Sequence, residues 1–262
     1  MVMRKIMIAA LLGLSFVVPV KDVRAEAFAK LSLDNIMKAL VRYGAVDIRN
    51  DLVIDLYAGI MVCDLYQELY HDDFKWNKVR NVLREKIKED IAFFPTGFQY
   101  DSVLQLGKYD FKEKIYRFSR KTAQFNTNVF RMSTNKGDDC NRQGGLQLPP
   151  TFEIVLDKPV TIVGIPMDEA AGKKLFERLE RNGNEDHLIY VRFKIGISYV
   201  APFIKTKARA AMNANEDFRR GSEEEDYETD KIRFDGYLHL LEFYEDPERT
   251  HLIYREEYSS TP

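Results

Sequence analysis

Apolar and polar positions alternate along residues 187–203, and an alternation of this kind predicts a β-strand. One face of the strand carries aliphatic and aromatic side chains, and the other carries mainly polar and charged ones. The apolar face comprises Ile189, Val191, Phe193, Ile195, Ile197 and Tyr199, and the polar face comprises Tyr190, Arg192, Lys194 and Ser198. We therefore expect the first face to join a hydrophobic core and the second to meet water.

Residues 31–94 show helical spacing instead. Three segments there repeat apolar residues every three or four positions. Ser32 and Asn50 are suited to cap the first two helices, and Gly44 is suited to end the first. The third segment stops before Pro95. The pattern predicts about three amphipathic helices.

After residue 97 the chain becomes rich in aromatic and β-branched residues separated by short turn signals. The elements we expect are hairpins at 104–119 and 152–165, a short strand at 129–132, a helix capped by Asp168, the strand at 187–203 and a hairpin at 232–257. The alternation flips at Leu240 and Leu241, which indicates either a β-bulge or a strand covered on both faces.

These elements predict an α+β fold, in which a helical segment of about three helices is packed with or precedes a mainly antiparallel sheet that carries one further helix. We expect a signal peptide at 1–25, a helical region at 26–96 and a β-rich α+β domain at 97–262. Within that domain, basic residues mostly precede acidic ones along 205–231. Such a run predicts a charged flexible loop, with a functional arm as the alternative.

The N-terminus has the three-part layout of a secretory signal peptide. Two basic residues at positions 4–5 precede an apolar run at 6–20, and charged residues follow directly. Small residues suit cleavage near Ala25, either before Glu26 or before Phe28. The apolar run is short for a membrane span, and no later segment is long enough for one. We expect a mature periplasmic or secreted protein without a transmembrane segment.

Charge and cysteine content narrow the function further. The full chain has a net charge of −2, and loss of the signal peptide would make the mature chain more acidic. Nucleic-acid binding needs clustered basic residues, so we expect no nucleic-acid partner. Cys63 and Cys140 are the two cysteines, and an exported chain could join them in a disulfide. The alternative places Cys63 on a helical face as a small core residue.

No motif for nucleophilic catalysis, phosphate binding or a cofactor is present. His187, His239 and His251 could hold a zinc ion if their strands were neighbours, but their spacing is not typical of a metal site. We therefore expect no catalytic residues, no metal and no cofactor. Tyr190 and Tyr237 are the aromatic residues expected on polar strand faces. With Arg192 and Lys194, they are the candidate partner-binding residues.

Two short stretches resemble an uncharacterised family of exported bacterial proteins. They are Leu106-Gly107-Lys108-Tyr109-Asp110-Phe111, and Pro166-Met167-Asp168-Glu169-Ala170-Ala171 followed by a helix that leads to Tyr190-Val191-Arg192-Phe193. The resemblance covers about residues 98–200. It implies an exported α+β domain and transfers no site residue.

The sequence thus favours a binding or structural partner of another cell-envelope protein over an enzyme. An edge strand or the 205–231 arm could engage that partner. The alternative is an envelope hydrolase acting on peptidoglycan or glycan, with Glu242, His239 or nearby acids as the acid/base pair.

Overall fold

The computed structural model describes residues 28–134, 148–201 and 231–258. This part of the chain contains five helices and nine strands. The helices are α1 (Leu33–Arg42), α2 (Asp51–Met61), α3 (Cys63–Leu69), α4 (Asp73–Ala92) and α5 (Glu169–Arg181). The strands are β1 (Ala29–Lys30), β2 (Gly97–Asp110), β3 (Ile115–Phe118), β4 (Gln124–Ser133), β5 (Thr151–Ile162), β6 (Gly164–Pro166), β7 (Leu188–Val200), β8 (Lys231–Tyr244) and β9 (Leu252–Glu257).

The helix starts follow local side-chain chemistry and confirm the predicted caps. Ser32 accepts a hydrogen bond from the backbone N–H of Asn35, and Asp168 accepts one from that of Ala171. Asn50 caps α2 in the same way. One detail of the helical prediction is wrong, because the single helix expected after Asn50 is two, α2 and α3, separated at Val62 by a non-helical backbone conformation.

The strands form one sheet with the order β4-β5-β8-β7-β2-β3-β6, while β1 pairs with β2 and β9 pairs with β8. The sheet is strongly curled. The rings of Phe98 in β2 and Phe152 in β5 lie 6.0 Å apart, although two strands separate β2 from β5 in this order. Val163 alone separates β5 from β6, which returns the sheet to β3. The aromatic side chains on the concave side therefore form the core.

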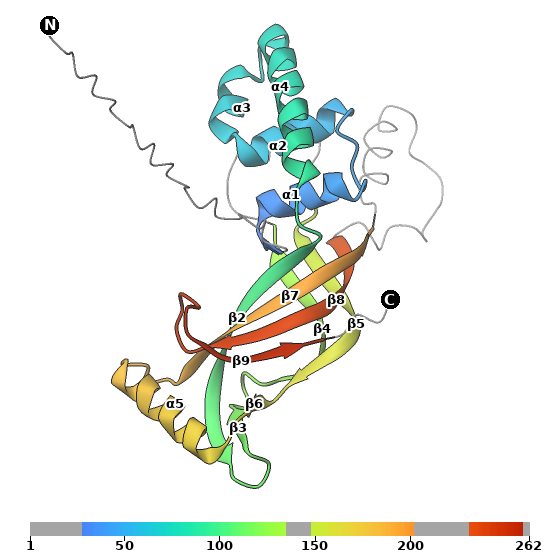
Figure 1. Cartoon of the computed structure of the whole chain (residues 1–262). Coiled ribbons are helices and arrows are strands. Elements are labelled where there is room, and N and C mark those ends of the chain that lie inside the picture. The colour runs from blue at the N-terminus through green and yellow to red at the C-terminus, as the bar shows by residue number, and fades with distance from the viewer. Residues whose placement is uncertain (1–27, 135–147, 202–230, 259–262) are drawn as a thin grey trace, which may run out of the picture.

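Helices cover the two ends of the curled sheet (Figure 1). Helices α1 to α4 lie above one end, and the hydroxyl of Tyr43, just after α1, bonds to the carbonyl oxygen of Thr96 at the start of β2. Helix α5 lies at the opposite end, where Gly172 packs so closely on Tyr109 that an added Cβ would lie 3.1 Å from the ring, closer than ordinary van der Waals contact. Among the described residues, no helix lies over the flank formed by β2, β7, β8 and β9 (Figure 1).

The predicted fold class is wrong in two respects. The sheet is mixed, because β5 pairs with β8 in parallel and β1 pairs with β2 in parallel. The helices do not form a separate N-terminal segment, because β1 precedes them and belongs to the same sheet as the strands that follow. Local periodicity identifies a strand but not its neighbour, so it could not predict pairs between segments so far apart in sequence.

Two local predictions also need correction. The hairpin expected at 152–165 is instead β5, which continues to Ile162 and is followed by β6, and the register of β5 with β4 shifts so that residues 156–159 have no partner on β4. Pro159 is tolerated there because bulged residues need no ladder hydrogen bond. Tyr199 is 54% exposed rather than buried, because the register between β7 and β8 shifts at Ser198 and reverses the alternation.

The strand at 187–203 is otherwise placed as predicted. β7 lies between β2 and β8 and is antiparallel to both. Its predicted core residues Ile189, Val191, Phe193, Ile195 and Ile197 are buried. Both alternatives for Leu240 and Leu241 hold, since β8 bulges at His239 and is buried on both faces from Leu240 to Tyr244.

Candidate functional site

The outer face, defined as the side of β2, β7, β8 and β9 that points away from the core, carries the four predicted partner-binding residues. Tyr190, Arg192 and Lys194 project from β7 onto this face, and each is half-buried. Tyr237 on β8 lies on the same face, beyond Lys194 along β7. Its ring packs over Gly196, and it lines a separate pocket of about 270 Å³ with Pro159 and Tyr258.

The strand register arranges the outer face in rows that run across the four strands. Register partners in one row alternate in charge, and those in the next row are apolar or aromatic. The charged row is Asp101, Arg192, Glu242 and Arg255, and the apolar row is Val103, Tyr190, Tyr244 and Leu252. Val103 and Leu252, at the ends of the apolar row, are 44% and 52% exposed. Cross-strand neighbours of opposite charge stabilise a sheet and fix side-chain positions.

Arg192 is held by Asp101. Its Nε and Nη2 donate to the two carboxylate oxygens of Asp101 at 2.9 and 3.3 Å. This hydrogen bonding raises the pKa of Arg192 above its usual value. Arg249, in the turn between β8 and β9, approaches the same carboxylate at 3.5 Å and lies over the ring of Tyr190. The guanidinium of Arg192 is therefore fixed in place before any ligand arrives.

Lys194 is held in the same way by Glu242, a residue that is only 5% exposed. The Lys194 Nζ lies 3.2 Å from Glu242 Oε2, and the hydroxyl of Tyr244 donates to the same oxygen at 2.9 Å. Burial, together with this hydrogen bond to a carboxylate, raises the pKa of Tyr244 to about 12. Glu242 thus anchors an ammonium group on the outer face.

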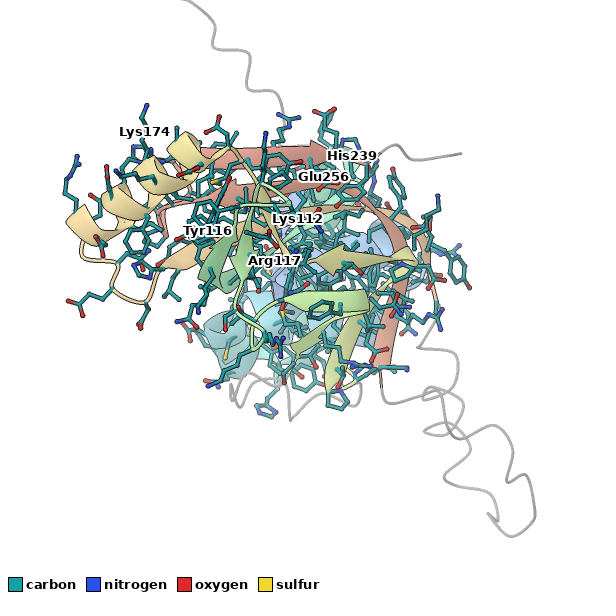
Figure 2. All side chains as sticks on the ribbon, turned by 90° about the horizontal axis from the view of Figure 1, so that it is seen from below. Lys112, Tyr116, Arg117, Lys174, His239 and Glu256 are labelled. Carbon is teal, nitrogen blue, oxygen red and sulfur yellow. The ribbon has the colours of Figure 1, made fainter. Side chains whose placement is uncertain are left out.

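These cations open onto a pocket of about 270 Å³, called here the basic pocket. Its lining combines basic, amide, imidazole and apolar side chains: Phe28, Gln99, Arg192, Lys194, His239, Leu240 and Arg255. The ring of His239 stacks on Phe28 at 5.4 Å. His239 and Glu256 lie over β8 and β9 in Figure 2, away from Lys174 on α5. The acidic partners of the basic residues are beside the pocket and do not line it.

The other end of the outer face has the opposite charge. A pocket of about 470 Å³, called here the acidic pocket, is lined by residues of the α5–β7 loop, the start of β7 and the β8–β9 turn. They include Leu188 and Tyr190 together with the carboxylates Glu185, Asp186, Glu245 and Asp246. Glu245 already pairs with Arg178 of α5 at 2.8 Å. β7 therefore runs from an acidic pocket to a basic one.

Asp246 shows how the β8–β9 turn is held. Partial burial acts to raise the pKa of its carboxyl group, but hydrogen bonds from the backbone N–H groups of Thr250 and His251 outweigh that effect and lower the pKa to about 2. The carboxylate thus organises the turn that carries Arg249.

Sequence reasoning did not identify Phe28, Gln99 and Arg255 as site residues. Arg255 comes from β9 and Gln99 from β2, and each reaches the basic pocket only through the strand register. An alternating pattern could have placed both on polar strand faces. Phe28 carries no signal of this kind.

Two alternatives depended on the histidines and on Glu242, namely a zinc site and the acid/base pair of a hydrolase. The ring of His187 lies 4.6 Å from that of Phe176 in a tilted arrangement, and His251 follows the β8–β9 turn. Within the described ranges, no group of three or more His, Cys, Asp or Glu side chains could hold a metal ion. His239 lines the basic pocket, whereas Glu242 does not and is instead held by Lys194 and Tyr244.

Several predictions fall on residues 1–27, 135–147 and 202–230, which lie outside the described residues. They are the signal peptide with its cleavage near Ala25, most of the 205–231 loop, and Cys140. Cys63 is the first residue of α3 and is half-buried. Its pairing with Cys140 stays a prediction, as does the division of the chain at residues 96 and 97.

No helix in the described part of the chain is long and apolar enough to cross a membrane. Comparison with curated proteins finds no match, and comparison with solved structures finds none. Residues 50–177 match the model of a family described as "Domain of unknown function (DUF4852)". The match includes Gln99 and Asp101 and ends before Arg192. The predicted similarity to an uncharacterised family is thus confirmed over residues 50–177, which a DUF4852 domain of unknown function covers.

Proposed function

We propose that the mature chain is a periplasmic or secreted binding protein that recognises another cell-envelope protein through its outer face. The observation that carries the proposal is the basic pocket, where Arg192 and Lys194 are anchored by Asp101 and Glu242 and still face the pocket. Preorganised charged groups of this kind favour binding, because little side-chain freedom is lost when a partner docks.

The composition of the outer face also supports a protein partner. Val103 and Leu252 expose apolar surface beside the charged row. Protein interfaces typically combine an apolar centre with polar and charged residues around it. The version of the hydrolase alternative that uses Glu242 lacks comparable support, because the Glu242 carboxylate lies under Lys194 and Tyr244 and does not face the basic pocket.

Export is supported by the basic, apolar and small-residue order of residues 1–25. We expect the chain purified from its host's envelope fraction to begin at Glu26 or Phe28. Intact-mass spectrometry and N-terminal sequencing test this directly. A chain that keeps Met1 and stays in the cytoplasmic fraction would remove the envelope partner from the proposal.

The partner role can be tested by introducing charge into the apolar row. We expect Val103→Asp with Leu252→Asp to abolish recovery of the partner when tagged mature protein is cross-linked in envelope extracts of its host. Both side chains are exposed, so the fold should persist. Phe111→Asp is the matched control, because Phe111 is 68% exposed in the β2–β3 turn, outside the outer face. Equal recovery from all three proteins would exclude the outer face.

A further inference from the structure

The basic pocket contains more hydrogen-bond donors than the surrounding protein uses. Arg192 commits Nε and Nη2 to Asp101, and among the described residues its Nη1 has no partner. Lys194 has three N–H groups and one carboxylate partner, Glu242. Arg255 bonds to Glu257 through Nη2. A pocket whose lining side chains keep free donors is suited to a group that only accepts hydrogen bonds.

The side chains around these donors also suit a ligand that accepts hydrogen bonds. The Gln99 amide can donate two further hydrogen bonds, and no partner for it is found in the described part of the chain. Leu240 and Phe28 supply apolar contact. Because the remaining lining residues are polar or charged, the pocket suits a small polar group rather than an apolar ligand.

Local charge balance indicates how much negative charge the basic pocket can take. Arg192, Lys194 and Arg255 are each paired with one acid, and Arg249 shares Asp101 with Arg192, so the surroundings carry only a small positive excess. A singly charged ligand needs only the directional donors, whereas a doubly charged phosphate would also meet repulsion from the neighbouring carboxylates. The pocket therefore favours a carboxylate.

We propose that the basic pocket binds a carboxylate group presented by the partner, with Arg192, Lys194 and Arg255 as its donors. This inference rests on the proposed function. The volume of about 270 Å³ suits one residue rather than a large ligand. Such a carboxylate comes either from an Asp or Glu side chain or from a chain terminus.

Nuclear magnetic resonance titration of the mature chain tests the inference with four small organic probes and inorganic phosphate. N-acetyl-glutamic acid amide and N-acetyl-glutamine amide differ in the side-chain carboxylate alone. N-acetyl-leucine and N-acetyl-leucinamide differ in the terminal carboxylate alone. We expect saturable binding of at least one acid, at millimolar concentrations, with at least tenfold weaker binding of its amide. The acid that binds better identifies the source. Equal binding of acids and amides, or tighter binding of inorganic phosphate, would overturn the inference.

Variants assign the binding to the basic pocket. We expect Arg255→Gln to weaken acid binding about tenfold, and Arg255 is half-exposed, so the fold should be unaffected. Lys194→Met combined with Glu242→Gln removes the ammonium without leaving a buried carboxylate unpaired, and should weaken binding by a similar factor. Lys174→Met on α5 is the matched control, since Lys174 lies away from the outer face (Figure 2). Unchanged affinity in both pocket variants would contradict the assignment.

The two proposals fail in different ways. If Arg255→Gln loses acid binding while partner recovery is unchanged, the carboxylate site stands and its role in partner recognition falls. If the Val103 and Leu252 variants lose the partner while no acid binds the native chain, the outer face stands and the carboxylate site falls.

Discussion

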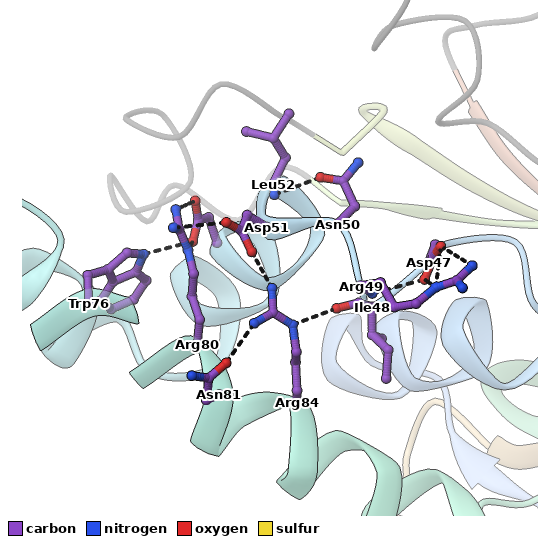
Figure 3. Close-up of polar contacts among 11 residues, drawn as sticks. Asp47, Ile48, Arg49, Asn50, Asp51, Leu52, Trp76, Arg80, Asn81 and Arg84 are labelled. Carbon is purple, nitrogen blue, oxygen red and sulfur yellow. Dashed lines mark hydrogen bonds and ion pairs between the residues drawn. The ribbon is translucent and has the colours of Figure 1, made fainter. Parts of the chain in front are cut away.

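Two charge networks in this protein use the same residue types and differ in how completely they are satisfied. The first joins α2 to α4 through Asp55, whose carboxylate is 3% exposed and accepts hydrogen bonds from Trp76 Nε1 at 2.8 Å and from Arg80 Nε and Nη2 at 2.8 and 2.6 Å (Figure 3). The remaining Arg80 nitrogen bonds to Asp51. Every nitrogen of this guanidinium is therefore used inside the protein.

Arg84 repeats the arrangement one turn further along α4. Its Nε donates to the carbonyl oxygen of Ile48, Nη1 donates to Asn81, and Nη2 donates to Asp51 (Figure 3). The helical network is thus closed. On the outer face, by contrast, Arg192 and Lys194 each keep donors directed at the basic pocket. The difference indicates that the first network joins helices, whereas the second is available for binding.

The largest effect is expected where the closed network is broken. Asp55→Ala should leave the buried indole N–H and much of the Arg80 guanidinium without an acceptor and lower the free energy of unfolding by about 3–5 kcal/mol. Urea denaturation measures this change. Asp47→Ala is the control, because the Asp47–Arg49 pair is exposed to solvent and should contribute little to stability. Similar losses in both variants would mean that burial does not distinguish the networks.

A smaller effect is expected for Lys194 and Glu242 in the outer-face network, which is called here the open network. Lys194→Met leaves Glu242 buried, with the hydroxyl of Tyr244 as its remaining partner, and should cost about 1–3 kcal/mol. Adding Glu242→Gln should recover most of that loss, because the buried charge is removed. A double-mutant cycle by urea denaturation measures the coupling, and additive losses would show that the two groups do not interact.

Acid should loosen the turn that borders the open network before it affects the rest of the sheet. The pKa of Asp246 is about 2 in the folded chain and 3.8 in the unfolded one, so its carboxylate stabilises the fold fully above pH 3.8. The contribution is lost as the pH falls towards 2. Hydrogen exchange at the amides of Thr250 and His251 should accelerate relative to that of β7 over this interval. Uniform acceleration across the sheet would contradict a local role.

The smallest effect on stability is expected at Arg255. Its pair with Glu257 is half-exposed, so Arg255→Gln should change the free energy of unfolding by less than about 1 kcal/mol. The same substitution should still weaken carboxylate binding, which separates binding from stability on the outer face. A thermal melt measures the change in stability, and a large fall in melting temperature would show that the Arg255–Glu257 pair stabilises the fold.

Local patterns were sufficient for much of the fold. The caps at Ser32, Asn50 and Asp168 and the buried face of β7 follow from residues close in sequence. The positions of Arg192 and Lys194 on a polar face follow in the same way. Failures occurred where long-range pairing decides the outcome, as in the mixed sheet and the bulged strand β5.

The candidate site shows the same contrast between local patterns and long-range pairing. Sequence alternation alone determined that Tyr190, Arg192 and Lys194 share the polar face of one strand, because side chains alternate across any extended chain. Only the tertiary structure decided that Gln99, His239 and Arg255 join them, since strand register is set by pairing between distant segments. Whether a charge is used up or left available depends on its neighbours in space, as Arg80 and Arg192 show.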